Sequence, residues 1–96
     1  MNSINIQAKE WFDKKNGNSY FSANIDIDGK HIGYLPFQYG YGDHYLDMVN
    51  QWLDENGYIN NPRHDNGSRD ALWRYCEDNS ITLYTNKAEN CLKRNL

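Results

Sequence analysis

The sequence has little of several features that mark particular protein classes. It contains two cysteines, with no CxxC pair and no Cys–His spacing that fits a zinc site. No apolar run approaches the roughly 20 residues that a membrane-spanning helix needs. The N-terminus has no basic segment followed by an apolar stretch, so we expect no secretory signal and a cytoplasmic location. There Cys76 and Cys91 are expected to be reduced, although the sequence leaves a disulfide between them open.

Positive charge is also scarce, and the shortage is local. Lys and Arg number 10 against 13 Asp and Glu, which gives a formal net charge of −3. Residues 36–66 carry only one arginine, Arg63, against five carboxylates. An acidic segment of this kind repels nucleic acid and suits a partner with a basic surface.

Aromatic residues, by contrast, are abundant. The mean hydropathy of −0.98 is low. However, three Trp, eight Tyr and three Phe are too many for a typical disordered chain. A length of 96 residues fits a single domain, residues 1–96, which should bury roughly 60–65% of its unfolded surface.

Residues 4–35 predict a three-stranded antiparallel meander. Asn16-Gly17 and Asp28-Gly29 are strong hairpin dipeptides, because type I′ turns need positive φ at both central residues. Two-residue turns at these places predict the cross-strand pairs Phe12–Phe21, Ala8–Ile25, Ile6–Ile27, Ile25–Ile32 and Ala23–Tyr34. These registers gather the apolar side chains on one face: Ile4, Ile6, Ala8, Phe12, Phe21, Ala23, Ile25, Ile27, Ile32 and Tyr34.

The other face of this sheet is expected to be polar, and therefore solvated or in contact with a partner. It would carry Asn5, Gln7, Lys9, Trp11, Tyr20, Ser22, Asn24, Asp26 and His31. Glu10 is the one misfit on the apolar face, where we expect it to reach water near the end of the sheet.

The rest of the chain predicts two helices and a late strand. Pro36 is expected to end the third strand. A helix from about His44 to Asn56 follows, with Gly42 or Asp43 capping its start and Gly57 its end. Its apolar stripe consists of Tyr45, Met48, Val49, Trp52 and Leu53. A second helix, about Arg69 to Asn79 with Ser68 as N-cap, would bury Leu72, Tyr75 and Cys76, and Trp73 is a further candidate for this core face. A strand at residues 81–84 would join an edge of the sheet. Residues 86–96 stay open between a short helix and a strand.

The expected architecture is therefore α+β: a three-stranded antiparallel β-meander, followed by two helices packed on one sheet face and a late fourth strand. Lys87, Lys93 and Arg94 give the tail a mild basic bias that we interpret as ordinary surface.

Two features of the middle segment are candidates for binding. In the connector Pro36 to Asp43, glycines alternate with Tyr39 and Tyr41 just before a helix. It is a tight turn, a protein-binding loop, or a nucleotide site at the helix start. Asp43, Asp47, Asn50 and Asp54 have the spacing of one outward helix stripe, which is either a solvated face or a set of carboxylates that meets a basic groove.

Catalysis has poor support in the residues. Asp26 and His31 should face each other as a surface ion pair, and His44 and His64 each adjoin an Asp without forming a metal motif. We therefore expect no enzyme, no metal and no cofactor. Trp11 and Tyr20, beside Lys9, are either an interface pair or a pair that the C-terminal segment covers.

Three stretches resemble small hypothetical proteins of bacteriophages and prophages: AKEWF at 8–12, NGNSYFS at 16–22 and PFQYGYGD at 36–43. The resemblance covers most of residues 4–58 and, more weakly, 91–96. It implies no activity. It implies a phage setting, in which small acidic proteins without catalytic motifs often inhibit host defence, as anti-CRISPR proteins do; this is an analogy.

The leading hypothesis is a non-enzymatic phage protein that binds and inhibits a host protein in the cytoplasm of an infected bacterium, such as a nucleic-acid-handling defence complex with a basic surface. The expected partner-binding residues are Trp11, Tyr20, Tyr39, Tyr41, Asp43, Asp47 and Asp54. The alternatives are a small-ligand or nucleotide binder that uses the connector, and a small nucleic-acid-binding protein that uses the polar sheet face, which the negative charge disfavours. No membrane partner is expected, and a homodimer through an exposed strand edge stays open.

Overall fold

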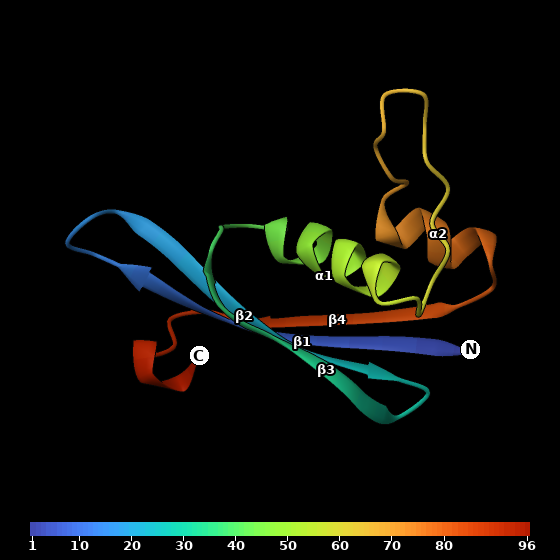
Figure 1. Cartoon of the computed structure of the whole chain (residues 1–96). Coiled ribbons are helices and arrows are strands. Elements are labelled where there is room, and N and C mark those ends of the chain that lie inside the picture. Colours follow the sequence, from blue (N-terminus) through green and yellow to red (C-terminus); the bar gives the residue numbers. More distant parts are fainter.

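The computed structural model describes residues 1–96 and has the expected α+β architecture (Figure 1). Four strands form one mixed sheet in the order β3-β2-β1-β4. Both helices lie on one face of this sheet, and the C-terminal segment lies on the other side (Figure 1). The elements in chain order are β1 (Ser3–Asp13), β2 (Asn18–Ile27), β3 (Lys30–Tyr39), α1 (His44–Glu55), α2 (Leu72–Asp78), β4 (Thr82–Ala88) and the 3-10 turn η1 (Lys93–Asn95).

The core lies between the helices and the sheet. Alternate residues of β1 and β2 point to the helix side and are buried, as strand periodicity requires. Fully burying one of the isoleucine or phenylalanine side chains among them contributes about 1.5–3 kcal/mol. The buried apolar residues are Ile4, Ile6, Ala8, Phe21, Ala23, Ile25, Leu35, Tyr45, Val49, Leu53, Ile59, Leu72 and Cys76.

The first hairpin has a different register from the predicted one. Asp13 pairs with Asn18, so the turn contains four residues, 14–17, rather than two. The Asp13 carboxylate causes this, because it accepts hydrogen bonds from the backbone N–H of Lys15 at 3.1 Å and from the side chain of Asn16 at 2.8 Å. Every predicted pair between β1 and β2 is therefore wrong by two residues, and Ile6 faces Ile25. A shift of two preserves the face of each side chain, so the predicted core face of these two strands holds.

For the second hairpin, the predicted register is confirmed at the turn and is wrong further along the strands. Asp28 and Gly29 both have positive φ, and Asp26 faces His31 as predicted. The register then shifts next to Ile25 and again between Phe21 and Ala23. The resulting pairs are Ile25–Gly33 and Ala23–Leu35 in place of Ile25–Ile32 and Ala23–Tyr34.

These shifts have a packing reason. The Trp52 ring lies against the backbone of Gly33, where a Cβ would overlap it. As a result Leu35 enters the core, while Tyr34 is exposed. Phe12, at the far end of β1, is also exposed rather than buried.

Three predicted boundaries are wrong. β3 continues through Pro36 to Tyr39, since β3 is an edge strand and tolerates a missing N–H. α2 starts at Leu72 with Ala71 as N-cap, not at Arg69 after Ser68. β4 extends to Ala88, parallel to β1, and residues 93–95 form a 3-10 turn.

Other expectations are confirmed. α1 spans His44–Glu55, and the Gly57 and Tyr58 N–H groups donate to carbonyls of Asp54 and Leu53 at 3.2 and 2.9 Å, a Schellman end. β4 joins an edge of the sheet. Cys76 and Cys91 are both free thiols, and burial raises the pKa of Cys76.

Candidate functional site

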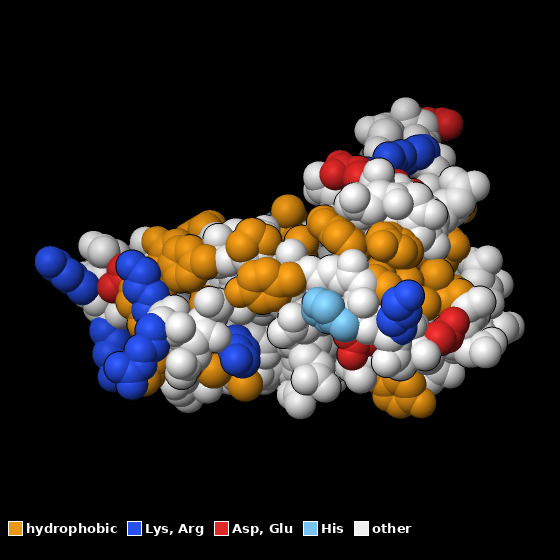
Figure 2. Space-filling model, turned by 60° about the horizontal axis from the view of Figure 1, so that its bottom comes forward, with side chains coloured by type: hydrophobic (Ala, Val, Ile, Leu, Met, Phe, Trp, Pro, Cys, Tyr) orange, Lys and Arg blue, Asp and Glu red, His pale blue; other side chains and the backbone are white.

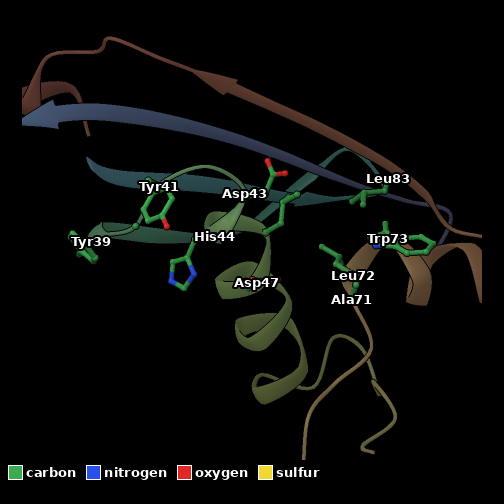
Figure 3. Close-up of a pocket in the computed structure, with 11 residues that line it drawn as sticks. Tyr39, Tyr41, Asp43, His44, Asp47, Ala71, Leu72, Trp73 and Leu83 are labelled. Atoms are coloured by element: carbon green, nitrogen blue, oxygen red, sulfur yellow. The ribbon is translucent and has the colours of Figure 1, made fainter. Parts of the chain in front are cut away.

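A groove of about 550 Å³ lies beside the N-terminal half of α1, and we name it the α1 groove. Figure 3 shows its walls: the end of β3 and the connector on one side, α1 in the middle, and α2 with β4 on the other. Leu46, Leu72 and Leu83 supply apolar lining from three separate elements. The other lining residues are Tyr39, Gly40, Tyr41, Asp43, His44, Asp47, Ala71 and Trp73.

Aromatic side chains lie along this groove without being packed into the core. Tyr41 is 72% exposed and Trp73 is 60% exposed, although exposure of large apolar side chains costs free energy. The predicted contribution of Trp73 to the core is therefore wrong. Large aromatics that remain accessible in a concave site are typical anchors for a partner.

The connector is held in place by close packing. Gly40 is buried, and a Cβ there would come within 2.8 Å of the Phe21 ring and 2.6 Å of the His44 ring. Gly42 has a φ of +60°. These glycines let the backbone turn tightly from β3 into α1, and the turn leaves Tyr39 and Tyr41 accessible.

Lys87 of β4 holds the connector in place, a role that no sequence pattern predicts. Its Nζ donates to the Gly42 carbonyl at 2.9 Å and forms an ion pair with Glu10 Oε1 at 3.3 Å. The Lys87 side chain is only 14% exposed. Two expectations are thus wrong: Lys87 is not ordinary tail surface, and Glu10 does not reach freely into water.

Two carboxylates line the groove without partners. Asp43 is the N-cap residue of α1, but its side chain makes no capping hydrogen bond. Asp47, one turn further, is exposed, and neither carboxylate takes part in an ion pair within the chain. No lysine or arginine lines the groove. The groove therefore combines apolar surface with uncompensated negative charge.

Asp54 has a different role from the predicted one. Its side chain is 10% exposed and accepts a hydrogen bond from Arg69 Nε at 2.7 Å, while Arg63 Nη2 lies 3.1 Å away. The Arg69 hydrogen bond, followed by one from the Asn61 N–H, lowers the pKa of Asp54. Its charge is thus neutralised within the chain, so Asp54 is not available to meet a basic surface.

Asn50 is also not on an outward stripe. It is buried, and its Nδ2 donates to the Asp70 carbonyl at 2.9 Å, while its Oδ1 accepts from Asn61 Nδ2 at 2.9 Å. Asn61 Oδ1 accepts in turn from the Asp70 N–H at 3.0 Å. This network fixes the chain just before α2, and so positions Trp73 in the groove wall. Only Asp43 and Asp47 of the predicted stripe face outward.

Trp11 and Tyr20 lie on the opposite face of the sheet, away from the groove. Their rings stack with centroids 5.5 Å apart, and both side chains are half-buried. The C-terminal segment folds back beside them, because the Cys91 N–H donates to the Glu10 carbonyl at 3.0 Å. Lys93 Nζ lies 5.4 Å from the centroid of the Trp11 rings. The predicted residues thus divide between two surfaces.

The histidines do not assemble into a reactive site. His31 and Asp26 form an exposed pair at 3.2 Å, and His64 bonds Asp70 at 2.6 Å in the segment before α2. No three His, Cys, Asp or Glu side chains are grouped so that they could hold a metal ion.

Neither helix has the length and apolar character needed to cross a bilayer. A comparison of the chain with known protein families, with curated proteins and with solved structures finds no match in any of the three.

Proposed function

We propose that this protein works by binding another protein in the α1 groove and has no catalytic activity of its own. One observation carries the proposal: the carboxylates of Asp43 and Asp47 are unpaired and line the groove. The exposed rings of Tyr41 and Trp73 line the same groove, whose walls are elements that pack on the core. Such a site suits a segment with an apolar side chain next to a lysine or arginine.

The energetics favour a protein partner over a nucleotide. A nucleotide phosphate at the start of α1 would meet the Asp43 and Asp47 carboxylates and no cation in the groove lining. A basic side chain there gains charge complementarity, while burial of an aromatic anchor contributes about 1.5–3 kcal/mol. The nucleotide alternative therefore receives no support from the groove.

The resemblance to phage proteins leads us to propose the class of partner. The partner would be a host protein with a basic surface, such as a nucleic-acid-handling defence complex, and occupancy of that surface would inhibit it. This proposal rests on the resemblance and on the charge of the groove, and Asp54 has no part in it.

The test is an affinity pull-down from a bacterial host lysate, with and without nuclease. Three baits are compared: the unmodified protein, Asp43→Lys with Asp47→Lys, and the matched control Asp65→Lys with Asp78→Lys. The control makes the same charge change on exposed residues outside the groove. We expect a stoichiometric, nuclease-resistant protein with the first and third baits, reduced about tenfold or more with the second.

Two results would reject the proposal. If the groove variant and the control retain the partner equally, the carboxylates have no role in recognition. If nuclease abolishes recovery, nucleic acid rather than the groove holds the complex together.

A further inference from the structure

We propose that the open face of the sheet, opposite the helices, is a second binding surface and takes single-stranded nucleic acid. The proposal uses none of the carboxylates of the α1 groove, and Tyr39, at the end of β3, borders both surfaces. It rests on an arrangement of aromatic rings and cations on that face, which the net charge of the whole chain conceals.

The rings form a continuous array across three strands, and we name Trp11, Tyr20, Phe37 and Tyr39 the aromatic platform. Tyr20 stacks on Trp11 at 5.5 Å and on Phe37 at 4.8 Å, with an interplanar angle of only 12° in the second pair. Tyr39 meets the edge of Tyr20 at 5.8 Å. Phe37 and Tyr39 are exposed, so bases can extend the stack at the β3 side.

Further ring surface lies along the same face. Tyr34 pairs with Asn24, and Tyr84 pairs with Asn5, so both tyrosines share the face of the platform. Both are exposed. On the same sheet, amide side chains of Gln7 from β1, Asn24 from β2 and Asn86 from β4 line a shallow depression of about 120 Å³. Stacking surfaces next to amide donors and acceptors match the faces and edges of unpaired bases.

Cations surround one end of the platform. Lys93 Nζ lies 5.4 Å from the Trp11 ring centroid and 5.7 Å from that of Phe37. Lys9 Nζ donates to the Asn95 carbonyl at 3.3 Å, which ties the C-terminal turn to the same edge. The exposed cations at this end are Lys9, Lys14, Lys15, Lys93 and Arg94. Figure 2 shows lysine and arginine side chains gathered at the left end of the molecule and hydrophobic ones across its middle.

The five exposed cations at this end outnumber the carboxylates near them. Glu10 and Glu89 are both paired with Lys87. Asp13 accepts hydrogen bonds within the β1–β2 turn and also lies near Lys93. Asp26 lies beside His31 towards the other end of the strands. The acidic groups of the α1 groove lie on the opposite face of the sheet. Phosphates can therefore approach the platform end without meeting the acidic segment.

The test is fluorescence anisotropy with labelled oligo(dT) and oligo(U) of about 12 nucleotides, and with a duplex of the same length. We expect Kd on the order of 10 µM for the single strands at low salt, and weaker binding of the duplex. Phe37→Ala should weaken single-strand binding about fivefold or more. Lys93→Ala should reduce the slope of log Kd against log salt concentration by about one unit.

Matched controls separate the platform from general charge and from the groove. Arg74→Ala removes an exposed cation on α2, and Trp73→Ala removes an exposed aromatic of the groove; neither should change oligonucleotide affinity. Thermal unfolding establishes that each variant is folded. Absence of binding at low salt would overturn the proposal, as would equal affinity for duplex or an unchanged affinity of folded Phe37→Ala. Trp73→Ala changes the groove and not the platform. A failure of protein binding in the groove can therefore be told apart from a failure of oligonucleotide binding on the platform.

Discussion

At the scale of single residues, Asp54 shows how the structure changes the meaning of a sequence pattern. Asp43, Asp47 and Asp54 do have the spacing of one helix face, but the charged groups around each of them differ. Two arginines from the segment before α2 neutralise Asp54, whereas Asp43 and Asp47 have no partner. A carboxylate that is paired inside the chain supports the fold, and an unpaired one is free for recognition.

Asp54→Asn should lower the free energy of unfolding by about 1–3 kcal/mol at neutral pH, because charge-assisted hydrogen bonds from arginine are lost. Urea denaturation measures this. The matched variant Asp47→Asn, at an exposed and unpaired position of the same helix, should change it by less than about 0.5 kcal/mol. Equal losses in the two variants would contradict the assignment.

The pH dependence of this difference has a definite sign. The pKa of Asp54 is lowered in the folded protein, mainly by Arg69. Its stabilising effect is therefore fully present above the unfolded pKa of about 3.9 and is lost as pH falls through the lower folded pKa. The stability gap between the unmodified protein and Asp54→Asn should be constant at neutral pH and narrow below about pH 4. A gap that widens in acid would refute this account.

At the scale of elements, the faces of the strands could be predicted and their partners could not. Side-chain alternation is local, so Ile4, Ile6 and Ile25 are assigned to the core from the pattern alone. Register depends on details such as the Asp13 hydrogen bonds and the Trp52 ring against Gly33, which join residues that no local pattern relates. β4 likewise gains its full length only from pairing with β1.

The Glu10–Lys87 pair should tie the connector to the sheet. Lys87→Met is expected to destabilise the protein by about 1–3 kcal/mol, since it leaves Glu10 as an unpaired, mostly buried carboxylate. It should also speed amide hydrogen exchange at residues 40–43, because the bond to the Gly42 carbonyl is lost. Adding Glu10→Gln should recover part of the stability but not the slow exchange. A double variant no more stable than Lys87→Met would show that the two side chains are not coupled.

At the scale of the whole molecule, the chain presents two surfaces of opposite character on the two faces of one sheet. The acidic α1 groove lies on the helix side (Figure 3), and the aromatic platform with its cations lies on the other. Overall composition records only their sum, a net charge of −3. The free edges of β3 and β4 are available to a second copy, so the homodimer stays a prediction.

Only the part of the candidate site that is formed by residues close together in the chain could be predicted from the sequence. Tyr39, Tyr41, Asp43 and Asp47 lie within nine residues, so composition and helix spacing single them out. The opposite wall comes from α2 and β4, and contact between distant segments leaves no signal in one sequence. Trp73 was missed for that reason: its spacing on a helix fits the core equally well.

Protein binding in the α1 groove is tested most sharply by site-specific photo-crosslinking from the groove wall. Trp73→p-benzoylphenylalanine places a photoreactive ring in the wall of the α1 groove, and Asp65→p-benzoylphenylalanine places the same ring on an exposed loop away from it. After irradiation in bacterial host lysate, we expect a single crosslinked protein from position 73 and none from position 65. That crosslink should disappear when Asp43→Lys and Asp47→Lys are added. The same crosslinks from both positions, or a crosslink that survives the charge reversal, would contradict the account.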